Sequence, residues 1–102
     1  MIKKTLAIFQ PHLFSRTRDF IDDFAESLSK FDDVILLDIY PAREEPIAGV
    51  TSEWLLSKIK NPNKKICIKI DLIHAIKNLS PEVLVVMGAG DIGQFIYNTS
   101  DG

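Results

Sequence analysis

Cationic side chains that could bind an anion follow the first predicted strand. The stretch Phe9 to Arg18 reads Phe-Gln-Pro-His-Leu-Phe-Ser-Arg-Thr-Arg and contains His12, Arg16 and Arg18. Guanidinium groups form bidentate hydrogen bonds to carboxylates and phosphates. Open α/β sheets bind their ligands outside the carboxyl ends of the strands, which is where this stretch is expected to lie. The two arginines are therefore candidate substrate contacts, and His12 lies in the same loop.

Each of these side chains also has an interpretation without a ligand. We place the arginines at the start of a helix, where a cation is disfavoured, so some partner should compensate. For Arg16 and Arg18 the alternative to an anionic substrate is a surface ion pair, and for Arg18 the two remain equally open. His12 has no Ser, Cys or acidic partner in its loop, so we interpret it as a hydrogen-bonding residue and not as a catalyst. The aspartates available for ion pairs are Asp19, Asp22 and Asp23.

A glycine turn follows the last predicted strand. Gly88-Ala89-Gly90-Asp91-Ile92-Gly93 fits G-x-G-x-x-G between a strand and a helix, the context of a dinucleotide site. That fingerprint also needs an acidic residue about 20 residues further on, and the sequence ends before that point. We therefore favour Gly88, Ala89 and Gly90 as a backbone approach to another anion. Asp91 is interpreted as a helix N-cap.

The elements that must position these residues follow a repeated strand and helix pattern. Apolar segments alternate with helical periodicity, which predicts an α/β, Rossmann-like, mostly parallel sheet with helices on both faces. The third strand alternates and carries lysines at its ends, so we expect it at an edge, whereas the others are apolar enough to be covered on both faces. The predicted strands are Thr5 to Phe9, Val34 to Tyr40, Lys65 to Lys69 and Val83 to Met87.

Four helices are expected between and after these strands. The first is amphipathic, and its apolar stripe recurs at three- and four-residue spacing. We expect Thr51 and Asp71 to cap the second and third helices, and a short fourth helix to run from Asp91 to about Tyr97. The stripe of the first helix is made of Phe20, Phe24, Leu28 and Phe31.

Size and composition describe one ordinary globular domain over residues 1–102. The chain is 46% hydrophobic and 25% charged with a net charge of −2, so neither nucleic acid nor a membrane surface is an expected partner. No apolar run reaches the roughly 20 residues needed to span a bilayer and no signal peptide is evident, so we expect a cytoplasmic protein. Cys67 is the single cysteine and is interpreted as a buried strand thiol. With His12 and His74 far apart, no metal site is predicted.

Three blocks, in order, resemble the C-terminal domain of the Mur ligase family. They are Phe9 to Arg18, Tyr-Pro-Ala-Arg-Glu-Glu-Pro-Ile-Ala-Gly from Tyr40 to Gly49, and Val83 to Ile92 with its glycine turn. The matches reach from about residue 6 to residue 93. The chain departs from the family at Leu13, where many members have arginine, and at Phe14, where tyrosine is usual.

The resemblance implies a function that this chain performs as part of a larger enzyme. Such ligases use ATP and Mg²⁺ to join L-alanine to UDP-N-acetylmuramic acid in peptidoglycan synthesis, through an acyl phosphate. The C-terminal domain closes over a central ATP-binding domain of the same polypeptide, which holds the phosphate loop and the metal ligands. No G-x-x-x-x-G-K-[ST] phosphate loop occurs here, so we expect no catalytic residue in this piece and no activity from it alone. The implied substrate contacts are Arg16, Arg18, His12, Gly88, Ala89 and Gly90.

Other functions stay open. A Mur-type ligase for another amino acid or a peptide would share these motifs. Saturable NAD binding at the glycine turn would indicate a free-standing dinucleotide-binding module, and a protein ligand at the strand-end loops would indicate an interaction domain. The charged residues Arg43, Glu44 and Glu45 receive no role from the sequence.

Overall fold

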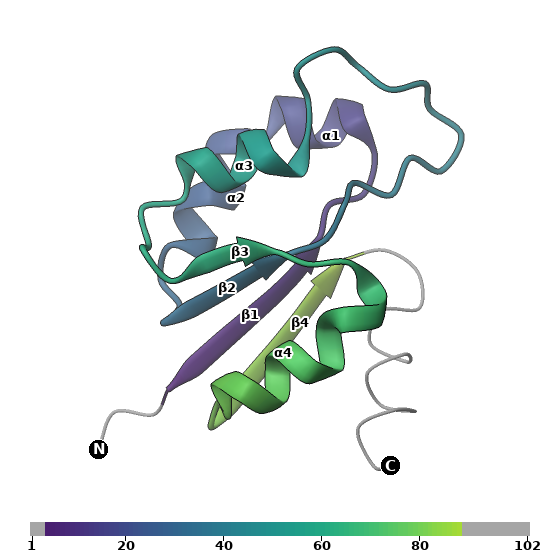
Figure 1. Cartoon of the computed structure of the whole chain (residues 1–102). Coiled ribbons are helices and arrows are strands. Elements are labelled where there is room, and N and C mark those ends of the chain that lie inside the picture. Colours follow the sequence, from purple (N-terminus) through teal and green to yellow (C-terminus); the bar gives the residue numbers. More distant parts are fainter. Residues whose placement is uncertain (1–3, 89–102) are drawn as a thin grey trace.

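The computed structural model describes residues 4–88 of the 102-residue chain. Within this range the backbone forms a four-stranded, all-parallel sheet with helices on both faces (Figure 1). The predicted α/β, Rossmann-like fold class is confirmed. The strands are β1 (Thr5–Gln10), β2 (Asp33–Leu36), β3 (Lys64–Ile66) and β4 (Val83–Gly88). The helices are α1 (Phe14–Asp19), α2 (Ile21–Leu28), α3 (Ser52–Lys58) and α4 (Leu72–Leu79), with a 3-10 turn η1 (Lys69–Asp71).

The order of the strands contains a topological switch point, because strands are first added on one side of β1 and then on the other. The sheet runs β3-β2-β1-β4, so the chain steps outward from β1 to β3 and then crosses back to place β4 on the other side of β1. The β1–β4 pairing extends from Thr5 opposite Val83 to Gln10 opposite Gly88. In open α/β sheets the ligand crevice lies at such a switch, outside the carboxyl ends of the strands. A ligand crevice is therefore expected at the edge where β1 and β4 end.

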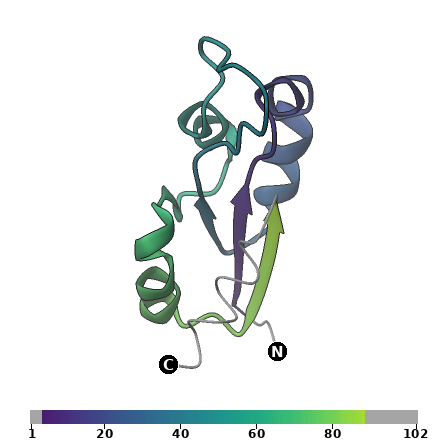
Figure 2. The same cartoon turned by 90° about the vertical axis from the view of Figure 1, so that its right-hand side faces the viewer.

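Two apolar layers sandwich the central strands. One face of β1, with Ala7 and Phe9, lies in a cluster with buried residues of α2 and α3. The alternate residues, Leu6 and Ile8, lie in a second cluster with Leu72 and Ala75 from α4. Figure 2 shows α2 and α4 on opposite sides of the sheet. Since successive strand side chains point to opposite faces, a strand buried on both sides reads as a continuous apolar run, as β1 does.

The strand predictions needed several corrections. β2 ends at Leu36 instead of Tyr40, although Leu37 and Ile39 beyond it are buried. β3 lies at the predicted edge but spans only Lys64–Ile66, and Cys67, which follows the strand, is half-buried. β4 has the predicted position but not the predicted burial, since Val83 and Leu84 are 37% and 38% exposed.

The first three predicted helices are right in position and partly wrong in detail. The first helix is broken at Phe20 into α1 and α2, and Phe20 is 47% exposed instead of buried in the stripe. Thr51 caps α3 as predicted, because its hydroxyl oxygen accepts a hydrogen bond from the Trp54 amide at 3.0 Å. Asp71 precedes α4 but its side chain makes no capping bond, since η1 leads directly into the helix. The helix predicted from Asp91 lies outside the described residues.

Within residues 4–88, none of the helices has the length and apolar character that crossing a membrane would require.

Candidate functional site

The loops after β1 and β2 are bonded to each other beyond the edge of the sheet. The Tyr40 amide donates to the Pro11 carbonyl and the Leu13 amide donates to the Tyr40 carbonyl, each at 2.8 Å. These bonds form an isolated parallel bridge between His12 and Tyr40. The two loops therefore extend the parallel pairing of β1 and β2 past the point where both strands end, and they hold their side chains in a defined place.

His12 lies in this extension and its side chain is exposed. Its ring centroid is 5.7 Å from that of Tyr40, with the planes tilted by 40°. The structure thus places His12 at the carboxyl edge, beside an aromatic ring. Its proposed contact with substrate stays a prediction.

Helix α1 has only six residues, so Arg16, its third residue, belongs to the first turn as well as the last, whereas Arg18 lies in the last turn. The prediction that both arginines lie at the start of a helix is therefore corrected at Arg18, whose charge the helix dipole favours at that end. The helix begins abruptly after Leu13, whose φ of 72° is unusual for a residue with a side chain. This turn takes the chain from the strand-end loop into α1.

The two arginines differ in their surroundings. The Arg18 Nε donates to Asp19 Oδ1 at 2.9 Å, and both side chains are about half-exposed. This hydrogen bond to Asp19 is the main cause that raises the pKa of Arg18, and the charge of Asp19 adds to it. Arg16 is exposed and its side chain has neither an ion pair nor a hydrogen bond with any residue of the range 4–88. The surface ion pair therefore exists for Arg18, and of these two arginines Arg16 is the one available to bind an anionic ligand.

Glu44 was missed as a site residue by sequence reasoning. It reaches from the loop after β2 to the start of α1, where its Oε1 accepts from the Ser15 amide at 3.0 Å and its Oε2 accepts from the Ser15 hydroxyl. The Ser15 hydroxyl is the main cause that lowers the pKa of the Glu44 carboxyl, followed by the Ser15 amide. Partners 29 positions apart leave no local pattern, and a carboxylate before Pro46 resembles ordinary surface charge.

The lowered pKa of Glu44 predicts an acid-sensitive contribution to stability. Because the folded-state pKa lies below the unfolded value, this contribution is present above the unfolded pKa and is lost as pH falls through the folded one. The nearby charge is Arg18, which also favours the ionised carboxylate. We expect the difference in thermal midpoint between the wild-type chain and Glu44→Gln to shrink on acidification below about pH 4. Thermal melts across that range check this, and a constant difference contradicts it.

Gly88 marks a close approach between the ends of β1 and β4. Its φ is 138°, and a Cβ placed on it would lie 2.5 Å from the Gln10 carbonyl oxygen. Only glycine fits there without movement of the backbone. The other two predicted residues of the turn, Ala89 and Gly90, lie outside the described residues, as does Asp91.

Two shallow pockets flank the end of β2 at this edge. One of about 170 Å³ lies beside Phe14 and the start of α3, and one of about 180 Å³ lies beside Gln10 and Ile68. Asp38 lines both of them. The carboxyl edge is therefore hollowed on either side of the loop that follows β2, next to α1 and the end of β1.

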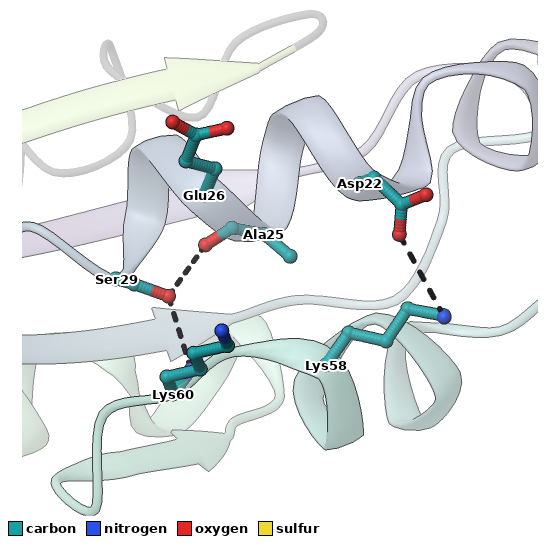
Figure 3. Close-up of a pocket in the computed structure, with 6 residues that line it drawn as sticks. All are labelled: Asp22, Ala25, Glu26, Ser29, Lys58 and Lys60. Atoms are coloured by element: carbon teal, nitrogen blue, oxygen red, sulfur yellow. Dashed lines mark hydrogen bonds and ion pairs between the residues drawn. The ribbon is translucent and has the colours of Figure 1, made fainter.

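A larger pocket of about 410 Å³ lies between α2 and α3 (Figure 3). Several of its polar groups bond to each other: Lys58 Nζ pairs with Asp22 at 3.7 Å, and the Ser29 hydroxyl accepts from the Lys60 amide at 3.0 Å. The same hydroxyl donates to the Ala25 carbonyl at 2.6 Å. These contacts join the two helices, so we interpret this pocket as a helix junction and place the candidate site at the carboxyl edge.

The resemblance assigns Mg²⁺ and ATP chiefly to a central domain, and the described residues offer no set of ligands for either group. No group of three or more His, Cys, Asp or Glu side chains within residues 4–88 could hold a metal ion. The phosphate-loop pattern is also missing from the sequence. We assign no step to a metal or nucleotide held by these residues.

Comparison with known proteins gives a consistent set of relatives, although no family model matches the chain. The UDP-N-acetylmuramate–L-alanine ligase of Flavobacterium johnsoniae is 62% identical over 94 residues, which are 92% of this chain and 21% of that ligase. The ligase of the same name from Christiangramia forsetii is 65% identical over 90% of this chain and 20% of its own length. That of Porphyromonas gingivalis is 54% identical over 92% of this chain and 21% of its own.

The chain therefore spans about one fifth of the length of the curated relatives it matches. The match to the Flavobacterium johnsoniae ligase must contain the motif blocks from Phe9 to Arg18 and from Tyr40 to Gly49, because 94 of the 102 residues are aligned and 102 − 94 leaves at most 8 outside. Over that length the chain is a homologue of a segment of the UDP-N-acetylmuramate–L-alanine ligases, and its resemblance to the Mur ligase family is confirmed.

Proposed function

We propose that this chain is the C-terminal, lid-forming domain of a ligase that joins L-alanine to UDP-N-acetylmuramic acid. The observation that carries the proposal is the 62% identity over 92% of the chain to a ligase named for that reaction. ATP and Mg²⁺ would be held chiefly by a central domain of the same polypeptide. A cytoplasmic location and a role in peptidoglycan synthesis belong to the same proposal.

The contribution of this domain would be orientation and exclusion of water. A closing domain brings a few side chains to a substrate bound elsewhere, and correct placement alone lowers a reaction barrier substantially. The carboxyl edge suits this role because Arg16 is exposed without a partner in residues 4–88 and lies on α1, whose first residue, Phe14, lines one of the two hollows. His12 and the backbone of the turn that starts at Gly88 would line the same crevice.

In this proposal Arg16 meets an oxygen that gains negative charge. Activation of a carboxylate as an acyl phosphate, followed by attack of the amine, builds charge on phosphoryl and carbonyl oxygens. A guanidinium fixed in a water-excluded crevice stabilises such charge more than one in bulk water. The ion pair with Asp19 makes Arg18 less suited to this task.

The proposal predicts that this chain alone neither hydrolyses ATP nor forms the amide product, because it has no phosphate loop. The same chain should support ligation when it replaces the matching segment of the Flavobacterium johnsoniae ligase. Product formation from ATP, Mg²⁺, L-alanine and UDP-N-acetylmuramic acid is measured for both proteins.

The control is the same ligase with the segment deleted, which should be inactive. Turnover by the isolated chain above a buffer blank counts against the role of a partial domain. A folded chimera that ligates no L-alanine counts against the proposed substrate.

A further inference from the structure

Helix α1 has no capping side chain of its own. Leu13 occupies the N-cap position, and an aliphatic side chain cannot accept a hydrogen bond from the first amides of the helix. Glu44 supplies the missing acceptor from the loop after β2. Its two carboxylate oxygens accept from the amide and the hydroxyl of Ser15, the second residue of α1. The cap is thus provided by a residue 29 positions away.

Glu44 is also the point at which its own loop is attached. The loop runs from Tyr40 to Val50, and most of its side chains are exposed, whereas Glu44 is half-buried. Its amide donates to the Pro41 carbonyl at 2.9 Å, which closes a turn and directs the carboxylate toward α1. One side chain therefore bonds the start of α1 to this loop, in addition to the backbone bonds at Tyr40.

Arg16, the proposed substrate contact, lies in the same turn of α1 as Ser15, to which Glu44 is bonded. Arg16 directly follows Ser15, and α1 is only six residues long, so a shift of its first turn moves the whole helix. The carboxylate also occupies the amide end of α1, which leaves the guanidinium as the anion-binding group of this segment.

We propose that Glu44 is a positioning residue for the ligation site, holding the first turn of α1 so that Arg16 projects into the crevice. This inference rests on the proposed function. A misplacement of about 1 Å can lower a rate about 100-fold, so a bond that fixes a helix can affect catalysis without touching substrate. We call the two hydrogen bonds between Glu44 and Ser15 the clamp. Through this clamp, the loop from Tyr40 to Val50 contributes to the geometry of the proposed ligation site.

The test is a double-mutant cycle in the active chimera. Glu44→Ala should lower kcat/KM for L-alanine about 10-fold, less than the largest effects of misplacement. If Glu44 acts through Arg16, the double variant should be no worse than Arg16→Ala alone, because the two losses overlap. Glu45→Ala removes the same charge at the neighbouring exposed position and should leave kcat/KM unchanged.

A second measurement follows the clamp without activity. Amide hydrogen exchange at Ser15 in the 102-residue chain should be faster in Glu44→Ala and unchanged in Glu45→Ala. Glu44→Gln keeps an acceptor for the Ser15 amide and should restore part of the protection and part of kcat/KM, which also covers the case in which Glu44→Ala folds poorly.

The outcomes separate the two proposals. An inactive, folded chimera counts against the proposed function. An active chimera in which Glu44→Ala has no effect, or in which its loss multiplies fully with that of Arg16→Ala, overturns the positioning role. Unchanged exchange at Ser15 in Glu44→Ala overturns the clamp itself.

Discussion

Arg16→Ala in a ligase that carries this segment is expected to lower kcat/KM by about one to two orders of magnitude. A hydrogen bond to a charged group contributes about 1.5 to 3 kcal/mol, and each 1.36 kcal/mol corresponds to a tenfold change in rate. Arg16 is exposed at the carboxyl edge and unpaired within residues 4–88, so its removal leaves no buried group without a partner. The thermal midpoint should therefore change little while activity falls.

Arg18→Ala is the matched control, since it removes the same charge from the same helix. Its guanidinium is bonded to Asp19 on the surface, and such exposed pairs contribute little. Its kcat/KM should stay near that of the parent. Arg16→Lys should restore little activity, because an ammonium does not reproduce the bidentate geometry of a guanidinium.

The measurements are kcat/KM for L-alanine and the thermal midpoint of all three variants. If Arg16→Ala and Arg18→Ala behave alike, or if the loss in Arg16→Ala only follows a loss of stability, Arg16 is a surface charge. The substrate contact proposed for it would then be wrong, although the fold and the family relationship would stand.

The fold could be predicted where burial and pairing coincide. β1 and β4 were placed to within one residue because both are continuous apolar runs that pair along their whole length. β2 was predicted too long because Leu37 and Ile39 are apolar and buried without being strand residues. Its neighbour β3 pairs only as far as Ile66, so β2 has a partner on one side only beyond that point. The apolar pattern indicates which residues are buried, but it does not show where the hydrogen-bonded pairing between two strands ends.

The break at Phe20 illustrates a second limit of periodicity. The core positions of α2, Ile21, Ala25 and Leu28, keep the expected spacing and are buried. Phe20 continues the same spacing backward, yet the backbone there leaves the helical region with φ −115° and ψ 23°. Its ring centroid lies 6.4 Å from that of Phe24 in an edge-on arrangement, and about half of the residue stays exposed. Spacing identifies the face of a helix but not the residue at which the helix breaks.

The candidate site was predictable in its location and not in its connections. The strand order confirms that the loop with His12 and the end of β4 lie at one edge, as expected for residues that follow parallel strands. The bond between Ser15 and Glu44 depends on how two loops meet, which no local pattern encodes. The pairing of Arg18 with Asp19 instead of Asp22 or Asp23 likewise depends on where α1 ends.

Gly88→Ala is expected to destabilise the chain far more than Gly49→Ala. Both glycines have positive φ, 138° at Gly88 and 80° at Gly49, so an alanine is strained at either position, at a cost on the order of 1–3 kcal/mol. They differ in space, because a Cβ at Gly49 meets no atom within 4 Å, whereas one at Gly88 lies 2.5 Å from the Gln10 carbonyl oxygen. That contact is with backbone, so relief requires β1 and β4 to separate.

Overpacking of this kind costs a further amount of about 1–3 kcal/mol. In a domain of this size each kcal/mol lowers the thermal midpoint by about 4–8 °C, so Gly88→Ala should lower it by roughly 10 °C or more. Gly49→Ala should cause about half that loss or less, since only the backbone strain applies. Thermal unfolding of the two variants of the 102-residue chain decides the matter. Equal shifts would mean that the ends of β1 and β4 separate easily, and the carboxyl edge would then lack the fixed strand ends that our placement of the site requires.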